Sequence, residues 1–339
     1  MSNPNASLVI TSIAAPNAVM KSFAKKCTEE DMEFILIGDG SSPADFSLEG
    51  CRFYSLAEQK KLPFRLAALL PENHYSRKNI GYLLSKEKQL IIESDDDNMP
   101  KKSFWQQRTQ NQAATLHTDA GWINVYRHFS DQDIWPRGFP LEQISGIAPS
   151  MVNGRPDSYR ESMVNSPIQQ GLADGNPDVD AVYRLTKKLP INFDSSKPIA
   201  AGNNSWCPFN SQNTTWFQEA FLLLYLPSTC RFRMTDIWRS FIAQRIAWTC
   251  GWSILFHDAT VIQERNSHDL MKDFEDEIPG YLHNAEICRQ LEDMDLRSGK
   301  ENLAENLIRC YRMMTKKQFI SQVELPMVDA WIHDMSTTQ

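Results

Sequence analysis

The chain has 339 residues, of which 42% are hydrophobic, and it carries a formal net charge of −7. This composition is that of a folded globular protein long enough for one large domain or two smaller ones. The acidic balance argues against nucleic acid as the main partner, because binding to a phosphate backbone needs a basic surface. The seven cysteines include no CxxC pair, which favours reduced thiols over a disulfide framework.

The first hundred residues alternate between strand and helix patterns. Helical spacing is found at 17–26 and 78–85, and strand formers occupy 7–11, 32–37, 51–54 and 89–93. This β-α-β order predicts a parallel sheet with right-handed crossovers. Ligands of such sheets bind at the carboxyl ends of the strands, where Thr11, Asp39 and the acidic triplet 95–97 fall. We therefore expect a ligand site at this edge of the sheet.

The rest of the chain predicts further strands and a helical end. Helices are expected at 214–226 and 236–250, and strands at 121–127, 178–185, 198–201 and 252–256. From residue 281 onward the pattern is helical, with apolar residues repeating on one face. We predict a core domain over residues 1–280 and a helical extension over 281–339 that packs on it.

Three adjacent carboxylates, Asp95, Asp96 and Asp97, come just after the apolar strand 89–93. Their charges repel one another unless a cation or hydrogen bonds compensate. Hard divalent cations prefer oxygen ligands, and Mg²⁺ commonly takes one or two carboxylates together with substrate phosphates. A solvated acidic turn is the alternative. The position at the end of a buried strand favours a metal that bridges Asp97 to a diphosphate.

Polar residues near the other strand ends suit the rest of a nucleotide. Arg77, Lys78 and Asn79 lie at the start of a predicted helix, where Arg77 or Lys78 would neutralise a donor phosphate and the helix N-terminus would help to hold it. Asp39 follows the second strand, where a carboxylate accepts hydrogen bonds from a nucleobase or ribose. An exposed basic helix start and an ordinary Asp-Gly turn are the alternatives for these segments.

Later segments offer a base and a sugar-binding loop. Asp236 opens a predicted helix, so it either caps that helix or takes the proton of an acceptor hydroxyl. His268 lies in a polar loop and is a possible further metal ligand, although a surface role is the alternative. Asn210, Gln212 and Asn213 belong to a loop that interleaves amides and aromatics, as sugar hydroxyls and ring C–H groups require.

Several segments together resemble a known family, the STELLO-type glycosyltransferases. The resemblance runs from about Arg77 to Asp273 and is most specific over 135–142. The segments that carry it read RKNIGYLL, LIIESDDDN, WINVYRHFSDQDIWPRGFPLE, NPDVDAVYRLT, PFNSQNT, FRMTDIWRSFIAQRIAW and RNSHD. A more distant similarity is to the reversibly glycosylated polypeptides, which act as UDP-arabinose mutases.

The resemblance implies an α/β fold of the GT-A type, with a Rossmann-like nucleotide-binding half-sheet and a mixed acceptor half. It implies that Asp97 holds the metal, that His268 completes its coordination, and that Asp95 contacts ribose or metal. Asp236 would be the base or a carboxylate that orients the sugar. Arg137 and Arg239 would contact the donor phosphate or sugar.

We therefore expect a metal-dependent glycosyltransferase. It would use Mn²⁺ or Mg²⁺ and a nucleotide-sugar, in particular a UDP-sugar. The acceptor would be a glycan or lipid-linked saccharide in surface polysaccharide synthesis, and transfer would invert the anomeric centre. The alternatives are a nucleotide-sugar mutase, a non-catalytic scaffold of the same fold, and a nucleotidyltransferase, which the absence of glycine from 12–17 disfavours. With no signal-peptide pattern, we expect a cytoplasmic protein, peripheral at the inner membrane face through its acceptor or partner enzymes.

Overall fold

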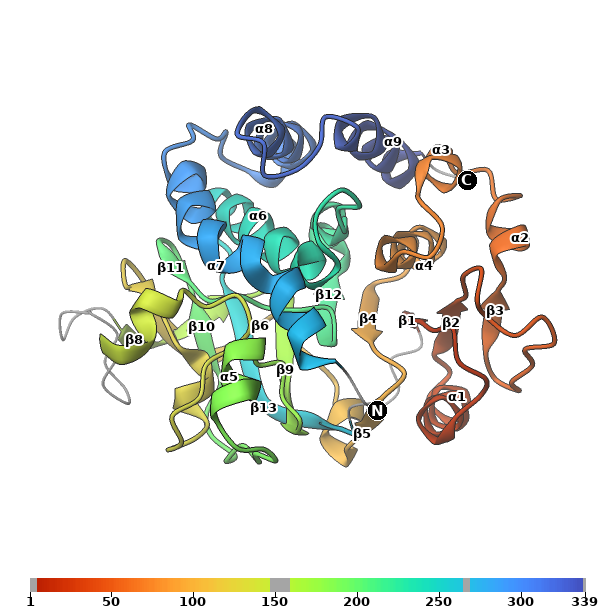
Figure 1. The fold of residues 1–339 in the computed structure, drawn as a ribbon, viewed down its shortest axis with the longest axis horizontal. Helices are drawn as coiled ribbons and strands as arrows, with labels where there is room; N and C mark the ends of the chain where they lie inside the picture. The colour runs from red at the N-terminus through yellow and green to blue at the C-terminus, as the bar shows by residue number, and fades with distance from the viewer. Residues whose placement is uncertain (1–4, 147–158, 265–268, 338–339) are drawn as a thin grey trace.

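A computed structural model describes residues 5–146, 159–264 and 269–337 (Figure 1). One large sheet runs through the molecule in the order β3-β2-β1-β4-β12-β9-β13-β10-β6-β8, and β5 pairs with β13 outside this path. Helices cover both faces of the sheet (Figure 1). The fold is therefore α/β, as expected from the alternation of strand and helix patterns.

The first part of the sheet is parallel. Its strands are β1 (Ala6–Thr11), β2 (Glu33–Ile37), β3 (Arg52–Tyr54) and β4 (Leu90–Ser94). Side chains alternate between the two faces, so that Leu8 packs in one apolar cluster with helix α1 (Ala18–Glu29), and Val9 in another with helix α4 (Lys78–Leu84). At Gly81 a Cβ would lie 2.4 Å from Val9 Cγ1, so the glycine lets α4 approach β1 closely.

The second part of the sheet is mixed. It begins where β12 pairs antiparallel with β4, and β9 and β13 run parallel at its centre. Its strands are β5 (Asn98–Pro100), β6 (Asn111–His117), β8 (Tyr159–Asn165), β9 (Ile168–Gly175), β10 (Ile199–Ala201), β12 (Asn213–Phe217) and β13 (Ile254–Gln263). A separate two-stranded sheet joins β7 (Gly121–Trp122) and β11 (Ser205–Trp206). A parallel half followed by a mixed half is the GT-A arrangement expected from the sequence.

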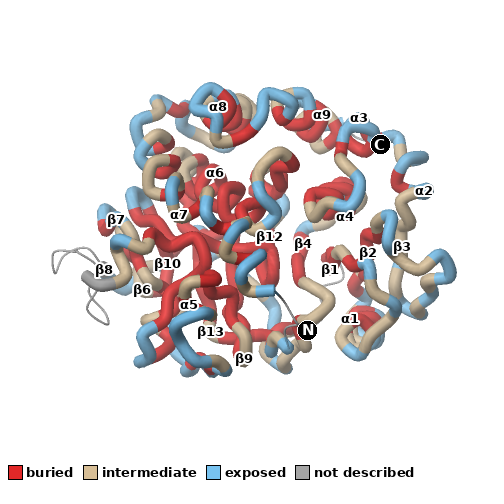
Figure 2. The backbone as a smooth tube through the Cα atoms, in the orientation of Figure 1, coloured by how far each residue is buried: buried red, intermediate tan, exposed pale blue. Residues whose placement is uncertain are grey.

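The remaining helices lie along both parts of the sheet (Figure 1). They are α2 (Leu56–Gln59), α3 (Arg65–Leu69), α5 (Ala181–Thr186), α6 (Thr235–Thr249), α7 (Leu270–Glu292), α8 (Leu303–Lys316) and α9 (Glu324–Ser336). The 3₁₀ segments are η1 (Tyr75–Arg77), η2 (Lys102–Trp105), η3 (Val125–His128), η4 (Leu141–Gly146), η5 (Gln218–Leu224), η6 (Phe232–Met234) and η7 (Lys300–Asn302). In Figure 2 the central strands and helix α6 are largely buried, whereas α8 and α9 have exposed outer surfaces.

The helical end is continuous with the main core. Helix α7 spans the expected boundary between residues 280 and 281, and Leu307 and Trp331 belong to the same apolar cluster as strand residues of the sheet. Trp331 Nε1 donates a hydrogen bond to the carbonyl of Leu222 in η5. Across the described part of the chain, no helix combines the length and hydropathy that spanning a bilayer demands.

Three sequence-based expectations for local structure were wrong. Residues 121–127 form only the two-residue strand β7 and then η3. Residues 178–185 contain helix α5, because Asp180 accepts a hydrogen bond from Tyr183 N and so caps a helix start within a segment of strand formers. Residues 214–226, expected to be helical, begin with β12, because that segment fills the place between β4 and β9.

Candidate active site

A cleft of about 570 Å³ lies at the carboxyl ends of β1, β2 and β4. Many of the residues expected at the site line it, namely Thr11, Asp39, Arg77, Asp95, Asp96, Asp97, Arg137, Gln212 and Asp236. The lining also includes residues that the sequence reasoning missed, namely Tyr75, Asp178, Arg184, Phe232, Arg233 and Gln263. The strand-end rule therefore located the cleft correctly, and the roles of its residues remain predictions.

Asp39 and Arg77 supply a hydrogen-bond acceptor and a buried hydrogen-bond donor to the cleft. The carboxylate of Asp39 accepts hydrogen bonds from the backbone N–H groups of Gly40 and His74, at 2.7 and 3.0 Å. Arg77 is only 1% exposed, and its Nε donates to Gln59 Oε1 at 2.7 Å. Burial lowers the pKa of Arg77, and its Nη2 makes no hydrogen bond within the described part of the chain. A buried, unpaired N–H group beside a cleft suits a ligand oxygen.

The first aspartate of the triplet is already compensated by a buried lysine. Lys78 is fully buried and its Nζ lies 3.2 Å from Asp95 Oδ1. The same ammonium donates to the carbonyls of Ser94 and Ser211, at 2.8 and 3.0 Å. The Tyr75 hydroxyl donates a hydrogen bond to Asp95 Oδ1 at 2.9 Å. Burial still raises the pKa of Asp95, although Lys78 and Tyr75 oppose this shift. Lys78 thus ties the acidic triplet to both parts of the sheet.

The other two carboxylates are less compensated. Asp96 accepts a short hydrogen bond from Ser12 Oγ, and Asp97 accepts one from Gln263 Nε2 at 3.1 Å. Burial, and then the charge of Asp95, raises the pKa of Asp97 to about 7. A bound cation would relieve the cost of ionising this group. The charge of Asp97 is therefore opposed by burial and by Asp95, and one side-chain hydrogen bond supports it.

The donor set at the triplet fits a hard divalent cation. Carboxylate oxygens of Asp97 and Asp95 are the ligands that Mg²⁺ and Mn²⁺ prefer. In residues 5–146, 159–264 and 269–337, no three His, Cys, Asp or Glu side chains lie close enough together to hold a metal ion by themselves. The protein would thus supply few ligands and a diphosphate the others, as is common for Mg²⁺. His268, expected to complete the site, lies outside the described residues.

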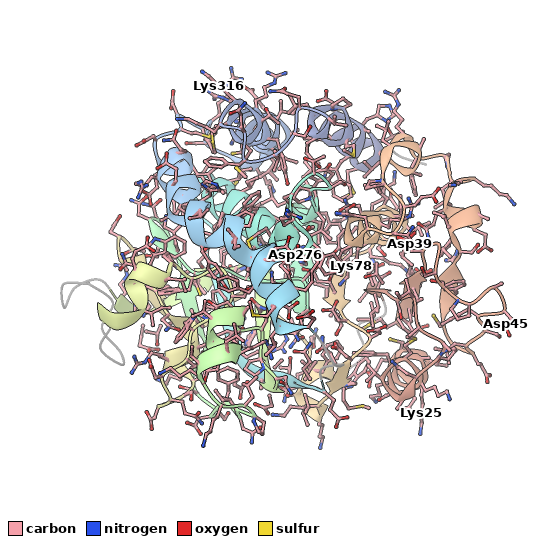
Figure 3. All side chains as sticks on the ribbon, viewed as in Figure 1. Lys25, Asp39, Asp45, Lys78, Asp276 and Lys316 are labelled. Atoms are coloured by element: carbon pink, nitrogen blue, oxygen red, sulfur yellow. The ribbon has the colours of Figure 1, made fainter. Side chains whose placement is uncertain are left out.

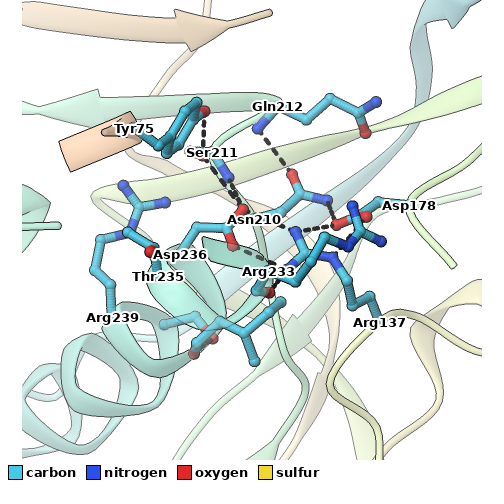
Figure 4. Close-up of polar contacts among 12 residues, drawn as sticks. Tyr75, Arg137, Asp178, Asn210, Ser211, Gln212, Arg233, Thr235, Asp236 and Arg239 are labelled. Carbon is cyan, nitrogen blue, oxygen red and sulfur yellow. Dashed lines mark hydrogen bonds and ion pairs between the residues drawn. The ribbon is translucent and has the colours of Figure 1, made fainter. Parts of the chain in front are cut away.

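In the same cleft, Arg137 bridges two carboxylates (Figure 4). Its Nε and Nη2 lie 2.8 and 2.9 Å from the two oxygens of Asp178, and its Nη1 and Nη2 each lie 3.0 Å from an oxygen of Asp236. Asp236 also accepts a bond from Ser211 N at 3.1 Å. Burial raises the pKa of both carboxyl groups, but Arg137 outweighs it, so the pKa of Asp178 falls to about 2 and that of Asp236 also lies below its ordinary value.

Two residues expected at the ligand are instead held inside the protein. The side-chain amide of Asn79 bonds to the backbone N–H and C=O of Leu226, both at 2.9 Å. Arg239 is 1% exposed and pairs with the fully buried Glu93 through two bonds of 2.9 and 3.0 Å. Neither residue lines the cleft, so the expected contact with the donor does not agree with their positions. The physical reason is that their polar groups compensate buried partners in the core.

The amide-rich loop is divided between cleft and core. Gln212 lines the cleft, and its Nε2 donates to Asn98 Oδ1 at 3.1 Å. Asn210 lies behind the cleft wall and donates to Asp178 at 2.8 Å. Asn213 is directed away, with its amide bonded to the carbonyl of Leu172 and to Thr260. The loop therefore offers one direct contact and supports Asp178 from behind.

The parallel half-sheet, the mixed half and the acidic cleft between them define an α/β protein with a GT-A arrangement. Residues 233–339 match the family model described as STELLO glycosyltransferases. The chain is 27% identical over 331 residues to the probable glycosyltransferase STELLO2 of Arabidopsis thaliana, covering 89% of this chain and 41% of that protein. It is also 27% identical over 350 residues to the probable glycosyltransferase STELLO1 of the same plant, covering 97% and 44%. The resemblance to the STELLO family is thereby confirmed, and the chain spans less than half the length of these relatives.

Two solved structures share a distant similarity. A mycobacterial protein aligns with a TM-score of 0.42 and 11% identity, covering 83% of this chain and 74% of that one. The glucosyl-3-phosphoglycerate synthase of M. tuberculosis aligns with a TM-score of 0.37 and 11% identity, covering 85% and 78%.

Proposed function

We propose that the protein is a metal-dependent glycosyltransferase that moves a hexosyl or pentosyl group from a UDP-sugar to a glycan or lipid-linked acceptor, in surface polysaccharide synthesis. The observation that carries the proposal is that Asp97, with its weakly compensated charge, shares one cleft with Asp39 and with Asp236. The names of the relatives, probable glycosyltransferases, support the same class of reaction.

The end of the cleft near Asp39 suits a uracil base. The imide edge of uracil presents an N–H donor flanked by carbonyl acceptors. Asp39 is the acceptor for that N–H group, and the unpaired Nη2 of Arg77 is the donor for a carbonyl oxygen. A site that leaves a buried donor unpaired discriminates strongly against ligands that lack the matching acceptor.

The metal is proposed to lie at Asp97 and Asp95. When bound, it would neutralise the charge that develops on the nucleoside diphosphate as it leaves. Lys78 holds Asp95 through an ion pair, and Gln263, in strand β13, orients Asp97 through a hydrogen bond. The protein's own contribution is therefore to hold two carboxylates at the end of β4 in a partly dry cleft.

Asp236 has two candidate roles, as the base of an inverting transfer or as a carboxylate that orients a sugar. Burial raises its pKa, but the charge and hydrogen bonds of Arg137 outweigh burial and lower it, which keeps Asp236 ionised and also makes it a weaker base. We therefore favour orientation, in which Asp236 accepts a hydrogen bond from a sugar hydroxyl. Inversion is retained as part of the proposal and requires a proton acceptor opposite the leaving group.

Binding of UDP, with and without Mn²⁺, tests the proposal. We expect UDP to raise the melting temperature of the wild-type protein when Mn²⁺ is present, and Asp97→Asn to abolish that metal-dependent part. Asp45→Asn is the matched control, because Asp45 is exposed, lies at the edge of the molecule in Figure 3 and does not line the cleft. An equal Mn²⁺-dependent shift in Asp97→Asn would contradict the metal site. Conversion of a UDP-sugar into an isomer without any acceptor would favour the mutase.

A further inference from the structure

Phe232 presents an aromatic ring to solvent at the cleft. Among the large apolar side chains that are exposed in the described part of the chain, Phe232 is the one aromatic, at 55% exposure. The others are aliphatic residues or methionines. It lies in η6, directly before α6, and it lines the cleft. Exposing most of a phenylalanine costs hydrophobic free energy, so an aromatic ring placed at a binding cleft indicates a use in recognition.

The ring is held by its neighbours. Its centroid lies 5.7 Å from that of Tyr75, with the ring planes at 72°, an edge-to-face contact. Tyr75 is fixed in turn, because its hydroxyl bonds to Asp95 and Ser211. Because Phe232 is still 55% exposed beside this partner, much of its surface is open to a ligand.

The backbone beneath the ring is fixed as well. The carbonyl of Arg233 accepts a short hydrogen bond from Arg137 Nη1, and the Arg233 guanidinium pairs with the buried Glu277 at 2.7 Å. These contacts anchor η6 to Arg137 on one side and to α7 on the other. Phe232 is therefore positioned before any ligand arrives, which reduces the entropy lost on binding.

We propose that the exposed face of Phe232 is a stacking platform for a pyranose ring of the acceptor. The face of an aromatic ring is the negative pole of its quadrupole, and the axial C–H groups of a sugar ring carry partial positive charge. We assign the platform to the acceptor because Phe232 lies in η6, directly before the helix α6 that carries Asp236, the carboxylate proposed to orient a sugar. Its ring also contacts Tyr75 in η1, which bonds to Asp95, so the platform adjoins the proposed metal site. The proposal rests on the proposed function, which it extends to the acceptor.

Saturation-transfer NMR with methyl pyranosides of glucose, galactose, mannose and xylose tests the platform directly. We expect saturation of the aromatic protons to reach the ring protons of at least one glycoside in the wild-type protein. The signal should be lost in Phe232→Ala, remain lost in Phe232→Leu, which keeps an apolar group without a flat face, and return in Phe232→Trp. Val323→Ala removes an exposed apolar side chain outside the cleft and is the matched control.

The outcomes separate the platform from the proposed function. Binding of UDP with Mn²⁺ should be unchanged in Phe232→Ala, because the proposal assigns the nucleotide to Asp39, Arg77 and the metal site, and Phe232 to the acceptor alone. Wild-type protein that transfers saturation to no glycoside, or an equal signal in Phe232→Leu, would overturn the platform. Glycoside binding without any UDP binding would leave the platform in place and remove the proposed transferase reaction.

Discussion

The buried pair between Arg239 and Glu93 makes a sharp prediction about stability. Both side chains are almost completely buried, and Glu93 also accepts hydrogen bonds from Tyr82 and Trp216. Arg239→Met would leave Glu93 with an uncompensated charge in the core, at a cost of about 3–5 kcal/mol. For a chain of this size each kcal/mol corresponds to roughly 2 °C, so the melting temperature should fall by about 6–10 °C.

A double variant separates loss of the pair from loss of packing. Glu93→Gln combined with Arg239→Met removes both charges, and we expect it to recover at least ~1–2 kcal/mol relative to Arg239→Met alone. Urea denaturation of the two variants and the wild type measures these differences. If Arg239 instead contacted the donor, Arg239→Met would lower UDP binding and leave stability unchanged. A variant Arg239→Met that keeps wild-type stability and loses Mn²⁺-dependent UDP binding would refute the structural role given to this residue.

Two further predictions concern the core. Burial raises the pKa of Asp180 to about 7, so the folded state favours the protonated carboxyl group. The resulting contribution to the free energy of unfolding is complete below pH ~4 and is lost as the pH rises through 7. Relative to Asp180→Asn, the wild type should therefore lose at most ~4 kcal/mol between pH 4 and 8 in denaturation curves, and parallel pH profiles would contradict this. Gly81→Ala would place a methyl group 2.4 Å from Val9 Cγ1 and should destabilise the fold by about 1–3 kcal/mol, whereas an unchanged urea midpoint would show that α4 moves away freely.

The sequence predicted the parallel half of the fold well because its signals are local. Strand patterns in the first hundred residues are each followed by a polar segment, and the strand-end rule brought Asp39 and Asp97 to one cleft. The mixed half was less predictable, because strands such as β9 (Ile168–Gly175), rich in buried polar residues, follow from pairing with distant strands and not from their own periodicity.

The same limit applies to the site. Asp236 and Arg239 are three residues apart on α6, and the family resemblance implied a contact with the ligand for both. Asp236 reaches the cleft, whereas Arg239 meets Glu93 beneath it, and only the partner on β4 distinguishes the two. Asp178 was missed because its segment was interpreted as a strand, although it lies within the string NPDVDAVYRLT that carries the family resemblance.

The central place of β13 limits how this protein can be divided. Residues 233–339, the part that matches the family model, contain β13, which pairs with β9 on one edge and β10 on the other. Expressed alone, that fragment would present two unsatisfied strand edges to solvent and would tend to aggregate. The most recognisable third of the chain is therefore not a portable module. A chimera of two relatives should therefore exchange the whole sheet together with this C-terminal segment.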